Sequence, residues 1–205
     1  MTTFYLVRHG QKAGGFNTPL SELGIKQAQT VAEFLTSFPI QSIIVSPLHR
    51  TRQSTEYIRL QLGIQVVIDE LLRERVSLGD VPNQSSEEFM TMWRKSYIER
   101  DWQPPIGDSS RKSGARLQKA IENYSHGNDE HILFVTHAGI ITDFLLNTFG
   151  AAFLNTIRSD FTQKNDRCIH EASITIIHYD RDQRQSSLAQ LATIEHLPKE
   201  LIIPK

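Results

Sequence analysis

Two short apolar runs, far apart in the chain, each end in a histidine, and this repetition constrains the fold more than any other feature. The first run is residues 4–7 (FYLV), followed by Arg8, His9 and Gly10; the second is residues 132–135 (ILFV), followed by Thr136 and His137. Such runs are typical of strands buried on both faces. Because the carboxyl ends of parallel strands face the ligand crevice of an open α/β sheet, we expect both histidines to converge on one site.

Short β-branched runs alternate with helical patterns along the rest of the chain. This alternation predicts a three-layer α/β/α sandwich, with a mostly parallel central sheet and helices on both faces. We expect strands at residues 3–7, 42–45, 66–68, 132–136 and 173–179, and a weaker one at 188–195, where Ala192 interrupts the alternation. We expect helices at residues 21–37, 47–62, 109–124 and 139–149.

The residues around His9 indicate phosphate chemistry. Arg8 offers a planar fork of donors that matches phosphate oxygens. A histidine beside it can attack phosphorus through one ring nitrogen if a hydrogen bond to the other nitrogen fixes the tautomer. Gly10 allows the backbone to approach closely at this point.

The predicted helix at residues 47–62 supplies a second cation. We expect Ser46 to be its N-cap and Pro47 its first helical residue, which places Arg50 in the first turn. A helix N-terminus presents free N–H groups and the positive end of the dipole, so an anion is favoured there. Arg50 is therefore the expected second phosphate clamp, whereas Arg52 is expected to be structural or exposed.

The stretch between the third and fourth predicted strands is too long for a simple crossover. We expect one domain over residues 1–205, with a lid or cap inserted at roughly 75–115. Ser85 and Glu88 form a capping-box pattern that opens a helix there. The helix carries aromatic side chains at four-residue spacing, of which we expect Phe89 and Trp93 to pack in a stripe. Farther along, Tyr97 and Trp102 are expected to contact substrate.

Composition limits the partners. The formal net charge of this 205-residue chain is -1 and its charges are dispersed, so we expect neither nucleic acid nor a membrane as a partner. Cys168 is the single cysteine, which excludes an internal disulfide and a thiolate metal cluster. The apolar start is too short for a signal or membrane segment, so a cytoplasmic location is expected.

Six elements, in order, resemble the histidine phosphatase superfamily, which includes cofactor-dependent phosphoglycerate mutase, fructose-2,6-bisphosphatase and broad-specificity phosphomonoesterases. They are residues 8–11 (RHGQ), 17–28 (NTPLS, then Gly24 and QA), 46–54 (SPLHRTRQS), 72–75 (LRER), 107–109 (GDS) and 136–139 (THAG). Ordered motifs of this kind are far more specific than any one of them. The chain departs mildly from the family pattern at Thr51, Ser54 and Ala138, which are all small residues.

The resemblance implies a mechanism without metal or cofactor. His9 would attack the phosphoryl group of a small-molecule phosphate monoester, while Arg8, Arg50 and His137 hold its oxygens. Glu74 would protonate the leaving oxygen and later deprotonate water. The expected catalytic residues are thus Arg8, His9, Arg50, Glu74 and His137, and the expected substrate contacts are Arg8, Asn17, Ser21, Arg50, His137 and Ala138.

Several assignments have alternatives from the residues themselves. Glu74 could be a surface charge between Arg73 and Arg75, and the fallback acids are then Asp80, Glu87 and Glu88. Asn17 could form an Asx-turn before Pro19, and Ser21 could cap the helix that follows it.

Other functions compete with a phosphatase. Residues 93–97 (WRKSY) with the Pro104–Pro105 pair resemble the lid of the mutases, whose basic residues take a substrate carboxylate. A zinc hydrolase is a distant alternative, because none of the eight histidines forms an H-E-x-x-H pattern. A phosphate-binding module without turnover is disfavoured, because all the expected catalytic residues are present. The substrate stays open, as does the choice between monomer and homodimer.

Overall fold

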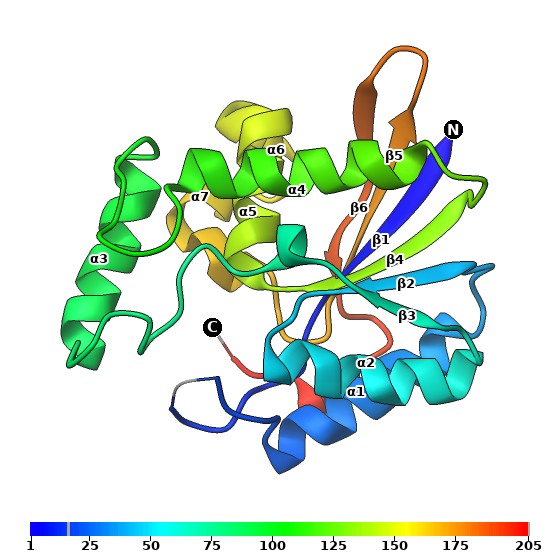
Figure 1. Ribbon diagram of the computed structural model, residues 1–205, viewed down its shortest axis with the longest axis horizontal. Helices are drawn as coiled ribbons and strands as arrows, with labels where there is room; N and C mark the ends of the chain where they lie inside the picture. Colours follow the sequence, from blue (N-terminus) through cyan, green and yellow to red (C-terminus); the bar gives the residue numbers. More distant parts are fainter. Residues whose placement is uncertain (16, 205) are drawn as a thin grey trace.

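The computed structural model describes residues 1–15 and 17–204, and it confirms the α/β/α sandwich around a six-stranded sheet (Figure 1). The strand order is β3-β2-β4-β1-β5-β6. The first four strands in the chain run parallel: β1 (Thr2–Arg8), β2 (Ser42–Val45), β3 (Val66–Ile68) and β4 (His131–Thr136). An antiparallel pair completes one edge: β5 (Ile174–Asp180) and β6 (Gln185–Thr193).

Helices cover both faces of the sheet, as the sequence predicts. On one face lie α1 (Glu22–Leu35) and α2 (His49–Leu62), and on the other lie α4 (Ser110–Ser125) and α5 (Ala138–Thr148) (Figure 1). Successive residues of β1 point to opposite faces, so Phe4 and Leu6 pack with α4 and α5, whereas Tyr5 and Val7 pack with α1 and α2. Both faces of the central strands are therefore apolar, which explains their unbroken apolar runs.

Helix α3 (Ser86–Ile98) stands apart from the sheet, beyond the end at which β1 and β4 finish (Figure 1). The capping box is confirmed: the Ser85 hydroxyl accepts from the Glu88 backbone N–H, and the Glu88 carboxylate accepts from that of Ser85. A small cluster of its own, built on Val76, Met92 and Trp93, packs under the helix. This segment lies within the range expected for a lid, and the description of one domain with a lid insertion stays a prediction.

The start of α2 differs from the sequence prediction. Its N-cap is Leu48, whose own side chain makes no cap hydrogen bond, so the helix begins two residues later than expected. The Ser46 hydroxyl lies 2.7 Å from His137 Nε2 instead. Ser46 was therefore wrongly predicted as the cap, because its hydroxyl has a partner from β4's end that local sequence does not reveal. Arg50 still lies in the first turn, as predicted.

The region after α5 contains elements that the sequence analysis did not predict. They are α6 (Gly150–Ile157), α7 (Phe161–Lys164) and the 3₁₀ turn η2 (Asn165–Cys168). Two more 3₁₀ turns lie outside this region: η1 (Glu70–Leu72), directly after β3, and η3 (Lys199–Leu201), near the C-terminus. Strand β6 is present and begins earlier than expected. Ala192 has a φ of 45° and donates to the Thr175 hydroxyl, which accounts for the interrupted alternation.

No single helix among the described residues is long and apolar enough to cross a membrane. Within the same part of the chain, α5 and α6 taken together reach that length and composition, as a pair bent by 111° at the break between them.

Candidate active site

The ends of β1 and β4 bring His9 and His137 together, as the two apolar runs predict. The strands pair in parallel up to Arg8 and Thr136, and the His9 backbone N–H then donates to the Thr136 carbonyl. The two imidazole centroids lie 5.1 Å apart. A common edge of the sheet therefore carries both histidines.

The tautomer of His9 follows from its partners. Its Nδ1 lies 2.6 Å from the Gly10 carbonyl oxygen, which can only accept, so Nδ1 carries the proton. In the neutral ring the lone pair is then on Nε2, toward which Arg50 Nε donates at 3.0 Å. The side chain of His9 is buried, with 5% of its surface exposed. His9 is thus a neutral imidazole whose Nε2 is aimed at a guanidinium.

Burial keeps both histidines neutral. It lowers the pKa of His9 well below the ordinary value of 6.5, and the charges of Arg50 and Arg8 lower it further. Burial likewise lowers the pKa of His137, again assisted by Arg50. Because both rings are uncharged, the field of the site is set by the side chains around them. Among the described residues, six basic and three acidic side chains line the site, and this excess of positive charge favours an anionic group.

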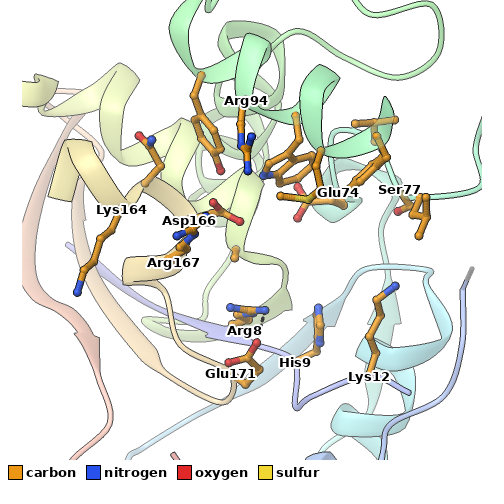
Figure 2. Close-up of a pocket in the computed structure, with 18 of the residues that line it drawn as sticks. Arg8, His9, Lys12, Glu74, Ser77, Arg94, Lys164, Asp166, Arg167 and Glu171 are labelled. Carbon is orange, nitrogen blue, oxygen red and sulfur yellow. Dashed lines mark hydrogen bonds and ion pairs between the residues drawn. The ribbon is translucent and has the colours of Figure 1, made fainter. Parts of the chain in front are cut away.

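Arg8 is held in place by a segment that the sequence analysis left without an element. Its Nη1 donates to the Ile169 carbonyl and its Nη2 to Glu171 Oε1, both at 2.5 Å. The ion pair is largely buried and orients the guanidinium beside His9 (Figure 2). Glu171 is a residue of the site that sequence reasoning missed, because nothing in its local pattern distinguishes it from a surface carboxylate.

Glu74 follows η1 in the chain, and its carboxylate lies against the N-terminus of α5, which begins after the N-cap His137. Its Oε2 accepts from the Gly139 N–H, and its Oε1 accepts from the N–H groups of Ile140 and Arg75, all at 3.0 Å. A Cβ on Gly139 would come within 2.5 Å of Glu74 Oε1, so only glycine leaves room for this contact. With 7% of its surface exposed, Glu74 is not the surface charge of the alternative interpretation.

These groups line a cavity of ≈ 530 Å³. Arg8, His9 and Arg50 lie on one side of it, and Glu74 and Ala138 extend this lining toward α5. Opposite them α3 contributes Phe89, Trp93, Arg94 and Tyr97, and a third wall is formed by residues 163–167 and Glu171. Figure 2 shows Arg94 projecting from α3 toward the space above Arg8 and His9. The two arginines Arg8 and Arg50, the predicted nucleophile His9 and the predicted acid Glu74 therefore share one cavity.

Three expected substrate contacts, Asn17, Ser21 and His137, are not among the residues that line the cavity. His137 lies behind His9, fully buried, with its Nε2 2.7 Å from the Ser46 hydroxyl. The side-chain oxygen of Asn17 accepts from the His49 backbone N–H at 2.9 Å, and so satisfies one of the free N–H groups at the start of α2. The Ser21 hydroxyl caps α1 by accepting from the Gly24 N–H and donates to Gln11 Oε1. Neither side chain lines the cavity. Both have structural partners instead, so this geometry does not support their expected contact with substrate.

The aromatic residues of the lid segment that line the cavity differ in part from those predicted to contact substrate. Phe89 and Trp93 pack together, as expected, but they line the cavity as well. Tyr97 lines it, whereas Trp102 lies outside it, with the Lys95 ammonium 4.6 Å from its ring centroid. The long side chain of Lys95 reaches back over the indole, a contact that helical spacing alone does not indicate.

The fallback acids have other functions in the fold. Asp80 accepts from the Ser77 N–H at 2.6 Å, Glu88 closes the capping box, and Glu87 is exposed. None of the three lines the cavity. Of the four acids considered from the sequence, Glu74 is thus the one that lines the cavity. In the part of the chain that the structure describes, no three His, Cys, Asp or Glu side chains are grouped as metal ligands would be.

Comparisons with known proteins agree with this geometry. The family model of the histidine phosphatase superfamily (branch 1) matches residues 4–191. The chain is 36% identical over 163 residues to a probable phosphoglycerate mutase of Proteus mirabilis, covering 72% of this chain and 74% of that one. It is 32% identical over 136 residues to a protein of the same name from Yersinia pestis, covering 60% and 63%.

Solved structures share the fold. A mycobacterial glucosyl-3-phosphoglycerate phosphatase with bound inorganic phosphate superposes with a TM-score of 0.74 at 21% identity, covering 97% of this chain and 100% of that one. Phosphoserine phosphatase from Entamoeba histolytica, in complex with 3-phosphoglyceric acid, gives 0.72 at 22% identity, covering 97% and 100%. At these identities the likeness concerns the fold.

Proposed function

The chain belongs to the histidine phosphatase superfamily, and we propose that it is a metal-independent phosphomonoesterase that works through a phosphohistidine on His9. The observation that carries the proposal is the fixed tautomer of His9, a buried neutral imidazole whose lone pair on Nε2 faces Arg50 in the cavity that Arg8 also lines. A nucleophile needs this lone pair, and an anionic phosphoryl group needs these cations.

In the first step, Nε2 of His9 bonds to phosphorus as the ester P–O bond breaks. Arg8, Arg50 and the second histidine, His137, hold the equatorial oxygens of the transferring group. The bonding pair leaves with the substrate oxygen, which takes a proton from Glu74. The products of this step are a free alcohol and a phosphohistidine.

In the second step, the Glu74 carboxylate takes a proton from water. The resulting hydroxide bonds to phosphorus, the N–P bond breaks, and its electron pair returns to His9 Nε2. Inorganic phosphate leaves, Glu74 is protonated again, and both residues are restored. The same carboxylate therefore acts as acid and then as base.

One observation favours a mutase as the second candidate. The Proteus and Yersinia relatives carry that name, and Arg94, within the segment that resembles the mutase lid, lines the cavity. A mutase must shield the phosphohistidine from water and return the phosphoryl group to a bound acceptor. Whether water or a bound acceptor takes the phosphoryl group from His9 therefore separates the two candidates.

A panel of phosphomonoesters, assayed with and without EDTA, tests the proposal. We expect several unrelated esters to release inorganic phosphate at rates that EDTA does not change. Product analysis with 3-phosphoglycerate, primed by 2,3-bisphosphoglycerate, is the decisive arm. Fast interconversion of 2- and 3-phosphoglycerate with negligible phosphate release would replace the phosphatase with the mutase.

A further inference from the structure

Two neighbouring residues, Glu74 and Arg75, grip α5 at consecutive turns. The Glu74 carboxylate binds the N–H groups of Gly139 and Ile140 at the helix N-terminus. One turn later, Arg75 Nη1 donates to both oxygens of Asp143 at 3.0 Å. The Arg75 backbone N–H also donates to Glu74 Oε1. The position of the carboxylate is therefore coupled to where the arginine lies along the helix.

Arg75 also connects this grip to the lid. Its side chain is completely buried, with 0% of its surface exposed, and its guanidinium carbon lies 3.8 Å from the ring centroid of Trp93 and 4.2 Å from that of Tyr97. Ser110 accepts from Arg75 Nη1 and donates to the Ser96 carbonyl of α3. The arginine is thus placed between the catalytic carboxylate and the inner face of α3.

We propose that Arg75, held by Asp143, is the positioning residue that sets the Glu74 carboxylate at the α5 N-terminus according to the location of α3. The proposal rests on the proposed role of Glu74 as proton donor. Arg75 does not touch substrate; it acts through Glu74. When α3 is packed on the guanidinium, the carboxylate is held in place, and when α3 moves away the grip on α5 weakens.

A contribution to folding stability does not by itself explain why Arg75 and Asp143 form a buried ion pair here. A buried ion pair is often no better for stability than apolar residues of the same shape, because desolvation offsets the attraction. Among the described residues, Nε and Nη2 of Arg75 have no hydrogen-bond partner, which a stabilising pair would avoid. The ion pair instead fixes the orientation of the Arg75 side chain. Its Nη1 donates to both Asp143 oxygens, and this holds the guanidinium plane against the rings of Trp93 and Tyr97.

The titratable groups that face Asp143 come from α3 and from the loops on either side of it. Arg75 and Glu74 approach from the loop after η1, and Arg100, just after α3, donates to the Asp143 carbonyl. The uncharged phenol of Tyr97 approaches from α3. Burial raises the pKa of Asp143 to about 6, although Arg75 opposes the shift. The carboxylate that anchors the arginine is thus sensitive to the packing around it.

The test compares the two arginines that flank Glu74. Arg75→Met should slow the best alkyl monoester of the panel by about 10- to 100-fold, because a carboxylate misplaced by an ångström protonates poor leaving groups badly. p-Nitrophenyl phosphate, whose leaving group scarcely needs a proton, should lose less than about threefold. Arg73→Met is the matched control, because Arg73 is exposed, and it should leave both rates unchanged.

A double variant separates positioning from general damage. In a Glu74→Gln background, Arg75→Met should cause no further loss, because both changes remove the same proton donor. Equal slowing of both esters by Arg75→Met, or a full further loss in that background, would overturn the proposal. If Arg75→Met does not fold, Asp143→Asn, of the same shape, takes its place in the same comparisons.

Failure of the proposed function gives a different result. If Glu74→Gln itself slows both esters equally, the role of Glu74 is wrong, and this inference falls with it. If Glu74→Gln shows the leaving-group dependence but neither Arg75→Met nor Asp143→Asn does, the phosphatase mechanism stands and only the positioning role is rejected.

Discussion

At the scale of single residues, the neighbours of His9 fix its tautomer. The Gly10 carbonyl fixes its proton on Nδ1, which leaves Nε2 as the nucleophile. Brief incubation with a labelled phosphomonoester should therefore give acid-labile, base-stable label on the protein, and His9→Ala should show none. The matched control is His49→Ala, an exposed histidine at the start of α2 that should keep label and turnover. Turnover by His9→Ala near the wild-type rate would contradict the assignment.

The two arginines on the first turns of α2 differ in burial and so in expected effect. Arg50 is buried and donates to His9, whereas Arg52 is exposed. Arg50→Ala should weaken transition-state stabilisation by about 2–4 kcal/mol, measured as kcat/KM, by analogy with the loss of an oxyanion contact. Arg52→Ala should change it little. A large loss at Arg52 with none at Arg50 would identify the wrong clamp.

The lowered pKa values of His9 and His137 make the fold sensitive to acid. Below the ordinary value of 6.5 the unfolded chain binds protons that the buried rings exclude, so their contribution is complete above pH 6.5 and is lost as the pH falls below it. Each histidine should therefore lower the free energy of unfolding by up to about 1.4 kcal/mol for every pH unit by which the pH falls below 6.5.

Urea denaturation at several pH values between 5 and 7.5 measures the slope of the unfolding free energy against pH. His137→Gln should reduce this slope by the contribution of one histidine. Asp143, whose pKa is raised to about 6, contributes the opposite slope, because its stabilisation is lost as the pH rises through 6. Wild type and variant share Asp143, so the difference between them isolates the histidine. Identical slopes would show that His137 titrates normally.

At the scale of elements, the N-terminus of α5 concentrates much of the chemistry. The helix begins after His137, its first N–H groups hold Glu74, and its next turn holds Arg75 through Asp143. The Cβ of Gly139→Ala would displace Glu74 and also meet the Trp93 ring at 2.8 Å. Alkyl monoesters should then be hydrolysed at least about tenfold more slowly, and p-nitrophenyl phosphate much less so.

A second glycine provides the control for that substitution. A Cβ on the exposed Gly127 would find its nearest neighbour at 3.5 Å, an ordinary contact, so Gly127→Ala should change neither rate. Wild-type kinetics for Gly139→Ala would show that the α5 N-terminus can shift without affecting the acid.

At the scale of the whole molecule, buried apolar packing is unevenly distributed among the elements. Two large apolar clusters join the sheet to its helices, whereas α3 rests on the small cluster around Trp93. Amide hydrogens of α3 should therefore exchange with solvent much faster than those of β1 and β4. Vanadate, a phosphate analogue, should slow exchange in α3, because α3 lines the cavity. Equal protection of α3 and β4 without ligand would contradict a separately opening lid.

Much of the fold and part of the site follow from local sequence. The apolar runs of β1 and β4 identify central strands, and the histidines that end them share one sheet edge because parallel strands align their carboxyl ends. The Ser85 capping box locates α3, and Arg50 falls in the first turn of α2 even though the cap was assigned wrongly. These features depend on backbone preferences and periodicities that act within a few residues.

The partners of the site residues were decided only by tertiary structure. Glu171 orients Arg8 from 163 positions away, Ser46 turns to His137 instead of capping α2, and Arg75 is buried under Trp93. A side chain that is polar or charged looks the same in sequence whether water or a distant residue satisfies it. Which of the two applies depends on chain closure over long separations, and that is set by the packing of the whole sandwich.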